Sequence, residues 1–138
     1  MVLSAKKNKL ENAELHFYDS LDRITFPIDI VHSSGTIQNV SEPYEFLSKL
    51  IRFNAPWVFF NRMVFNENDR DFITVQKSNL SSNGPGPLPT QYTDREISYP
   101  HTTVSFRKFN NIMLETYNLE WIFEIALGSH KINNERIR

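Results

Sequence analysis

A proline- and glycine-rich segment, residues 78–100, most constrains how this chain folds. It holds four of the seven prolines and two of the four glycines, mostly in one run, Gly84-Pro85-Gly86-Pro87-Leu88-Pro89. Each proline fixes its own φ angle and pushes the preceding residue towards an extended conformation, so no helix crosses this run. We therefore expect one long extended loop over residues 78–100, of a length at which an ordered loop usually has a function.

The residues before this loop predict two helices and a short strand. Residues 4–21 have apolar positions near helical spacing and predict an amphipathic helix. Residues 25–31 alternate roughly with period two and predict a short strand, followed by a turn at 33–35. A second helix is expected from about Ser41, as its cap, to about Arg52, because proline is tolerated in the first turn and apolar residues line one face.

Two β-rich runs, 57–65 and 72–75, flank the polar residues 66–69 and predict a β-hairpin. The first run has apolar side chains on both faces. We therefore expect at least one face to pack on a helix or on another chain.

Beyond the loop, apolar residues step by three or four from Phe106 to Trp121 and predict a long helix. It is expected to run from residue 102 or 103 to about Leu127, with Gly128 as its C-terminal stop. The predicted fold class is therefore α+β, in a single domain over residues 1–138. A short hairpin or sheet packs with helices, and a long Pro/Gly-rich loop precedes the long C-terminal helix.

The composition indicates one globular domain and excludes several classes of function. A chain of 138 residues, 40% of them hydrophobic and 11 of them Phe, is large enough for one core. Lys and Arg total 15 against 16 Asp and Glu, so the chain lacks the basic excess that usually marks a nucleic-acid-binding protein, and we expect no nucleic-acid partner. The absence of Cys removes disulfides, thiolate catalysis and Cys-ligated zinc. No apolar run has the length of a signal peptide core or a membrane span, which predicts a soluble cytoplasmic chain.

No set of residues makes a convincing catalytic, metal or cofactor site. His16 and Asp19 supply two ligands where zinc needs three or four. Residues 66–71 alternate oxygen donors as a calcium loop does, but Asp71 and Lys77 stand where Gly and Glu belong. Neither a nucleophile elbow nor a phosphate-binding loop occurs. We therefore expect no enzyme and no cofactor.

The proline run is the sharpest candidate for function. Pro85, Pro87 and Pro89 stiffen it before it binds anything, and this reduces the entropy lost on docking. Leu88 is its only large aliphatic anchor, with Tyr92 close behind. Two interpretations stay open on these residues alone: an element that docks on a partner, or a brace packed against its own domain.

The same run, Gly84 to Pro89, followed by Tyr92-Thr93-Asp94, resembles a family signature, Gly-Pro-x-Gly-x-Leu-Pro and then Tyr-Thr-Glu. This signature is that of the TssG (ImpH/VasB) family of type VI secretion baseplate proteins. Upstream, Ile51-Arg52-Phe53 and Trp57-Val58-Phe59-Phe60 resemble the family's Arg-Phe strand and the step after it. Downstream, Phe109-Asn110, Tyr117 and Trp121 have the spacing of a Phe-Asn, an aromatic residue and a Trp in the family's helix. The resemblance covers about residues 50–125.

The resemblance implies a structural role without catalysis. A TssG-like subunit binds a pair of TssF-like subunits in a cytoplasmic baseplate wedge docked at the inner membrane, and TssK-like trimers are a further partner. Family members are usually more than twice this length, and the half that is absent here helps to grip TssK. The resemblance implies that the interaction residues are those of the signature loop and helix, together with an apolar strand: Gly84, Pro85, Gly86, Pro87, Leu88, Pro89, Tyr92, Thr93, Asp94, Phe109, Asn110, Tyr117, Trp121, Trp57, Phe59 and Phe60.

Two rival interpretations remain beside the baseplate subunit. One is a small cytoplasmic immunity protein that neutralises a toxin by direct binding, although such proteins commonly carry an acidic face. The other is a pocket protein or enzyme of a cone-like α+β fold, which requires convergent polar groups that the sequence does not name.

Overall fold

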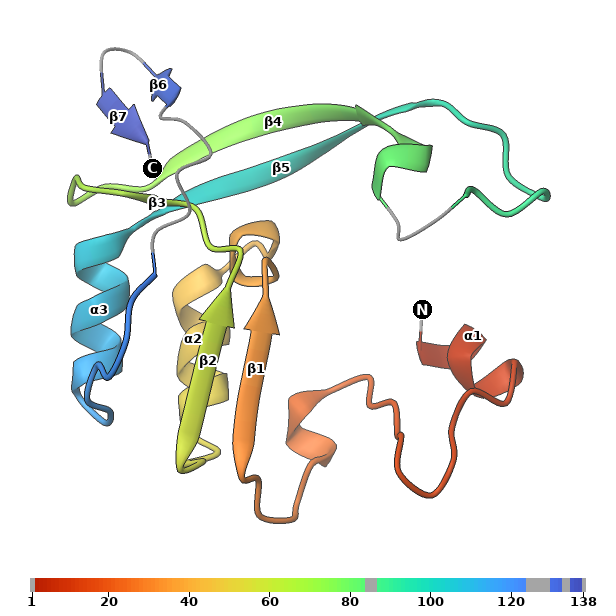
Figure 1. Ribbon diagram of the computed structural model, residues 1–138, viewed down its shortest axis with the longest axis horizontal. Coiled ribbons are helices and arrows are strands. Elements are labelled where there is room, and N and C mark those ends of the chain that lie inside the picture. The colour runs from red at the N-terminus through yellow and green to blue at the C-terminus, as the bar shows by residue number, and fades with distance from the viewer. Residues whose placement is uncertain (1, 84–86, 124–129, 133–134, 138) are drawn as a thin grey trace.

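The computed structural model describes residues 2–83, 87–123, 130–132 and 135–137 (Figure 1). Helices and strands share one small domain, and the predicted α+β class is confirmed. In chain order the elements are α1 (Val2–Lys7), β1 (Ile30–Ser34), α2 (Pro43–Ile51), β2 (Trp57–Asn61), β3 (Phe65–Asn66), β4 (Phe72–Asn79), β5 (Glu96–Ser105), α3 (Phe106–Leu114), β6 (His130–Ile132) and β7 (Glu135–Ile137).

The first structural unit is β1–α2–β2, in which the helix connects two parallel strands. The register runs from Ile30 opposite Trp57 to Ser34 opposite Asn61. α2 forms where it was predicted, because its apolar residues recur on one face and Pro43 occupies its first turn. Its cap is Glu42 rather than the expected Ser41, and the cap side chain makes no hydrogen bond to the helix.

The predicted hairpin between residues 57–65 and 72–75 is wrong. β2 pairs with β1, whereas β4 pairs antiparallel with β5, from Phe72 opposite Thr103 to Asn79 opposite Glu96. Figure 1 shows β4 and β5 as a long ribbon that extends away from α2 and α3. Residues 78–79 and 96–100 of the expected loop therefore belong to strands, and Leu80–Asn83 form a 3-10 turn.

β3 joins the ribbon to the rest of the molecule. It pairs in parallel with the end of β5 and antiparallel with β7, which gives the strand order β4-β5-β3-β7-β6. Asn66 on β3 is fully buried, and its Nδ2 atom donates to the carbonyl oxygen of Thr103 on β5 at 3.0 Å. This bond satisfies a buried amide that would otherwise be costly.

The long helix predicted over residues 102–127 is also wrong in its extent. Thr102 to Val104 lie in β5, as their run of β-branched side chains favours. Ser105 caps α3, since its Oγ atom accepts from the Lys108 amide at 3.3 Å. The helix ends at Leu114, and residues 115–123 are not helical. Gly128, the expected stop, lies outside the described residues.

The N-terminal helix predicted over residues 4–21 shortens to α1, and the expected strand over 25–31 shifts to β1. Lys9 adopts a positive φ of 53°, which ends the helical path. Asn12 then accepts from the amides of Glu14 and Leu15 at 2.8 Å, a local turn that competes with a helix. The expected turn at 33–35 begins two residues later, at Gly35, because Ser33 and Ser34 complete β1 and Gly35 follows with a φ of 61°.

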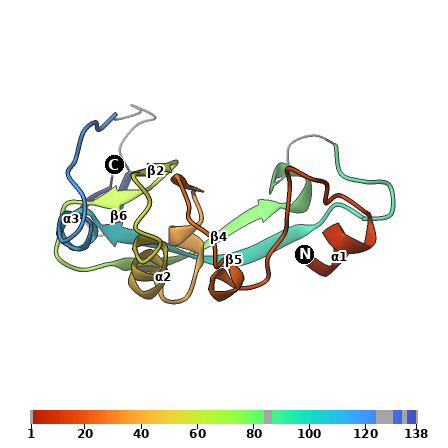
Figure 2. The same cartoon turned by 90° about the horizontal axis from the view of Figure 1, so that it is seen from below.

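The core consists of two apolar clusters that meet at α2. One contains Val31, Leu50 and Ala55; the other contains Ile37, Leu47 and Phe109. Phe46 and Phe60 contact both clusters. Figure 2 shows α2 and α3 gathered at one end of the β4–β5 ribbon and α1 towards the other end. None of the described helices has the length and apolar character needed to cross a bilayer.

Candidate functional site

The parallel pair β1–β2 has one covered and one open face. Alternate residues of β1 point to the core, where Val31 and Ser33 are buried near α2, and leave Ile30 and His32 exposed. On β2, Trp57 and Phe59 point the same way and are 56% and 53% exposed. The His32 ring stacks on Phe59 with centroids 5.4 Å apart. Parallel sheets in proteins are normally covered on both faces, so this apolar face is unusual for an isolated chain.

Phe60, the third predicted residue of this strand, belongs to the interior. Its ring meets Phe109 edge to face with centroids 5.2 Å apart. Phe65 contacts Phe109 similarly at 5.1 Å. Phe109 is itself buried in the second cluster, so these aromatic residues stabilise the fold and present little surface to a partner.

The described part of the proline loop is tied down at its base and exposed towards its tip. Gly84, Pro85 and Gly86 lie outside the described residues. Pro87, Pro89 and Thr93 are exposed, Leu88 is half-buried and Tyr92 is 58% exposed. The Tyr92 amide donates to the Pro89 carbonyl at 2.9 Å, which folds this stretch into a turn.

Asp94 ties the end of the loop to the 3-10 turn at its start. Its two carboxylate oxygens accept from the Ser81 amide at 3.0 Å and from the Ser81 hydroxyl at 2.8 Å. The pKa of Asp94 is lowered below its ordinary value. The hydrogen bond from the Ser81 amide is the largest cause, and the bond from the Ser81 hydroxyl is the second. Asp94 therefore braces the base of the loop, and Tyr92 is exposed nearer its tip.

The remaining predicted residues lie in α3 and in the stretch that follows it. Asn110 is half-buried, and Tyr117 has a buried hydroxyl without a hydrogen-bond partner among the described atoms. Trp121 is strongly exposed, as are the neighbouring Ile122 and Phe123. Figure 1 places the proline loop at the opposite end of the ribbon from α3. The structure therefore does not bring the predicted interaction residues together into one surface.

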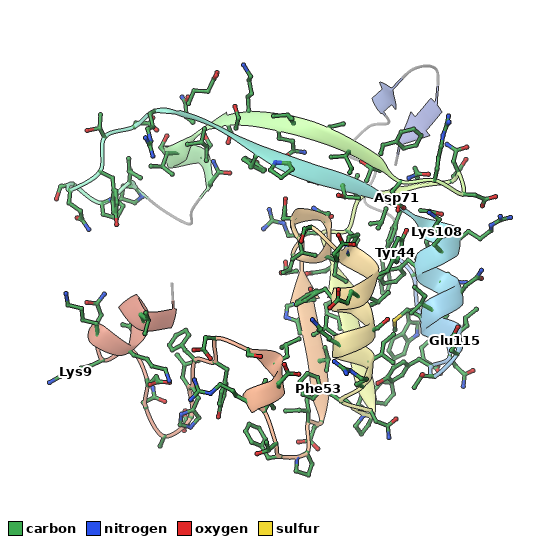
Figure 3. The ribbon with its side chains drawn as sticks, turned by 180° about the vertical axis from the view of Figure 1, so that it is seen from behind. Lys9, Tyr44, Phe53, Asp71, Lys108 and Glu115 are labelled. Atoms are coloured by element: carbon green, nitrogen blue, oxygen red, sulfur yellow. The ribbon has the colours of Figure 1, made fainter. Side chains whose placement is uncertain are left out.

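A polar cluster that the sequence did not reveal joins α2, β4 and α3 (Figure 3). The Tyr44 hydroxyl donates to Oδ1 of Asp71 at 2.5 Å, and the Ser105 amide donates to the same oxygen at 2.8 Å. Lys108 Nζ lies 3.5 Å from Oδ2 of Asp71 and 5.7 Å from the centroid of the Tyr44 ring. The pKa of Tyr44 is raised well above its ordinary value. Burial is the largest cause, and the hydrogen bond to Asp71 is the second. We refer to these four residues as the Asp71 cluster.

The Asp71 cluster has the chemistry of a clamp. Tyr44 keeps its proton at neutral pH and so does not act as a base there. Asp71 receives donors from two other elements, which holds α2 and the start of α3 to the start of β4. No spacing motif announces the cluster, because its members are separated by 27 and 34 residues along the chain.

Within the described residues, no group of three or more His, Asp or Glu side chains is placed to hold a metal ion. His16 is exposed, and its expected companion Asp19 pairs instead with Arg23 at 2.9 Å. A surface hollow of about 200 Å³ lies between the turn at Leu21–Arg23 and the end of α2, where Lys49, Arg52 and Phe53 line it.

Comparisons of this chain with protein-family models, with curated proteins and with solved structures give no match.

Proposed function

We propose that this chain is a non-catalytic subunit of a larger protein assembly, and specifically a structural component of a type VI secretion baseplate wedge. In that role it binds TssF-like subunits, with TssK-like trimers as a further partner. The resemblance of residues 50–125 to the TssG family supports the specific role, and the surface of the folded chain supports the general one.

The observation that carries the general role is the size of that surface. The accessible surface is 10838 Å² for a chain of 16.2 kDa. A compact monomer of this mass exposes about 7,500 Å², so this chain exposes roughly 3,300 Å² more. Obligate subunit interfaces bury roughly 2,000–5,000 Å² counted over both partners, about half of it from each, so an excess of this order is enough for such an interface on this chain.

Part of the exposed surface is apolar and belongs to particular side chains. Trp57 and Phe59 form an open aromatic face on β1–β2, and Trp121 and Phe123 are exposed beyond α3. Aromatic residues are enriched at the centres of protein interfaces, where they supply much of the binding energy. These side chains are thus better placed to bind protein partners than to serve a reaction.

Co-purification tests the proposal directly. The tagged chain, expressed with TssF-like and TssK-like proteins of the same source, is expected to retain the TssF-like protein through washing at high salt. Retention of neither baseplate protein, together with stoichiometric capture of one toxin, would establish the immunity-protein alternative and overturn the proposal.

A double variant, Trp57→Ser with Phe59→Ser, tests whether the β1–β2 face is used. Both side chains are more than half exposed, so the melting temperature of the isolated chain should change little while partner retention falls. Phe26→Ser is the matched control, since Phe26 is 51% exposed and lies outside the predicted surfaces. Equal loss of partner in both variants would argue against a specific site on this face.

Tyr92→Ala tests the projecting part of the loop in the same assay. If the loop docks, the variant loses partner but keeps its melting temperature. If Tyr92 only braces the domain, the melting temperature falls and retention at low temperature does not.

A further inference from the structure

The outer edge of β4 is an unpaired strand edge. β4 stands at the end of the strand order, so within the described residues its second edge faces no strand. The partner strand β5 carries Pro100 in mid-strand, opposite Val75. Proline blocks strand addition because it has no N–H to donate, and natural proteins use it to protect strand edges. β4 contains no proline over its eight residues.

The side chains along this edge alternate in a regular way. Ile73, Val75 and Lys77 lie on one face of the ribbon, and Ile73 and Val75 are 75% and 69% exposed. Two exposed β-branched residues on an open edge make a strand that readily pairs with another strand. Lys77 is the charged residue of this face that opposes pairing with another strand. Its Nζ atom lies 3.6 Å from the Oε1 atom of Glu96 on β5.

β4 is complementary to itself when it pairs antiparallel about Thr74. A twofold axis perpendicular to the sheet keeps the side chains of one face on the same face in both copies. Directly opposite residues must therefore have side chains on the same face, so the axis passes beside a residue that lies opposite its own copy. Centring on Thr74 places Ile73 opposite Val75 of the second strand, and it brings Asp71, the residue just before β4, level with Lys77 of the second strand. Both apolar pairs and both charge pairs are then favourable cross-strand neighbours.

The neighbouring registers are worse. An axis at Val75 places Ile73 opposite the charged Lys77, and an axis at Ile73 places Asp71 opposite Val75. The Thr74 register therefore makes two apolar pairs, whereas each adjacent register makes one, Val75 with Val75 or Ile73 with Ile73, beside two mismatched pairs.

We propose that two copies of this chain associate through β4, in antiparallel register about Thr74, to form a continuous sheet β5-β4-β4-β5. Each copy presents the same edge, so the contact is isologous and closes as a dimer. Asp71 keeps its place in the Asp71 cluster, and 23% of its side chain is exposed. This association is independent of the baseplate role, because it involves neither the β1–β2 face nor the proline loop.

A single cysteine tests both the dimer and its register. The chain has no Cys, so Thr74→Cys introduces the only thiol. Directly opposite residues of antiparallel strands have Cα atoms about 4.5–5.5 Å apart, within the range of about 4.4–6.8 Å that a disulfide spans. Oxidation of this variant should give a reducible dimer of twice 16.2 kDa as the main product.

Gln76→Cys is the matched control on the same face, two positions along β4. In the Thr74 register the two Gln76 Cα atoms are four positions apart along the strands, which is about 13 Å and too far for a disulfide. It should remain monomeric under the same oxidation. A folded Thr74→Cys chain that stays monomeric, or equal cross-linking of both variants, would overturn the proposal.

Val75→Lys provides a second, non-covalent test. Its side chain is 69% exposed in one chain, so the variant should fold and its circular dichroism spectrum should match that of the original. Its melting temperature should be independent of protein concentration, whereas that of the dimeric original should rise with concentration. In light scattering the original chain should show twice the mass of one chain, and the variant the 16.2 kDa of the monomer. An unchanged dimer in Val75→Lys would contradict pairing through this edge.

Discussion

Two tyrosine hydroxyls of this protein, one partly buried and one fully buried, lie in opposite surroundings. Tyr44 donates to the Asp71 carboxylate at 2.5 Å, a bond strengthened by the charge of its acceptor. The Tyr117 hydroxyl is buried beside the Ala55 backbone without a well-aligned hydrogen bond among the described atoms. Burial raises its pKa, and the Ala55 backbone lowers it in part. The same chemical group therefore stabilises the fold at one position and opposes it at the other.

Replacing each tyrosine by phenylalanine measures this difference. Tyr44→Phe leaves Asp71 with one donor fewer and should lower the free energy of unfolding by roughly 1–3 kcal/mol. Tyr117→Phe removes a desolvated hydroxyl at nearly constant volume and should be neutral or slightly stabilising. Urea denaturation of both variants gives the comparison. A larger loss in Tyr117→Phe than in Tyr44→Phe would mean that the Asp71 cluster is not a clamp.

At the scale of elements, the sequence predicts those whose signals are local. Apolar residues spaced along one face, with Pro43 in the first turn, were sufficient to predict α2. The choice of strand partners was not predictable, because β2 pairs with a strand before it in the chain and β4 with one after the proline loop. At residues 102–105 the β-branched Thr102, Thr103 and Val104 prevailed over the helical spacing that begins at Phe106.

The candidate site was predictable to a similar extent. Trp57 and Phe59 follow from the two-sided apolar pattern of their run, and the structure leaves both exposed. Phe109 has the same apolar character, and only the packing of α3 against β2 and β3 assigns it to the core. Asp71 could not be identified, since its donors come from residues far along the chain.

The base of the proline loop should respond to acid. The folded-state pKa of Asp94 is lowered, so its bonds to Ser81 are fully present above the unfolded pKa and are lost as pH falls through the folded value. The change therefore lies below about pH 4. The amide chemical shift of Ser81, followed from pH 6 to pH 2 by nuclear magnetic resonance, should titrate in this window. Asp94→Asn should abolish the titration, and a shift that persists in that variant would assign it to another group.

At the scale of the whole molecule, the large surface has a thermodynamic signature. An unfolded chain of this mass exposes about 23,500 Å², so folding buries about 12,700 Å² here, against about 16,000 Å² for a compact monomer. The urea m-value scales with the surface exposed on unfolding. The Val75→Lys monomer should therefore have an m-value about a fifth below the norm for its length. An m-value at that norm would show that the chain buries as much surface as a compact monomer does.

The two apolar clusters can form at different times during synthesis of the chain. The unit β1–α2–β2 is complete once residue 61 has been synthesised, and its Val31–Leu50–Ala55 cluster forms from that unit alone. Ile37 and Leu47 belong to the cluster that Phe109 completes, and α3 is synthesised only after the entire ribbon. A nascent chain on the ribosome therefore exposes the apolar residues of this cluster beside α2 until α3 has been synthesised. During this interval a chaperone would bind to these residues.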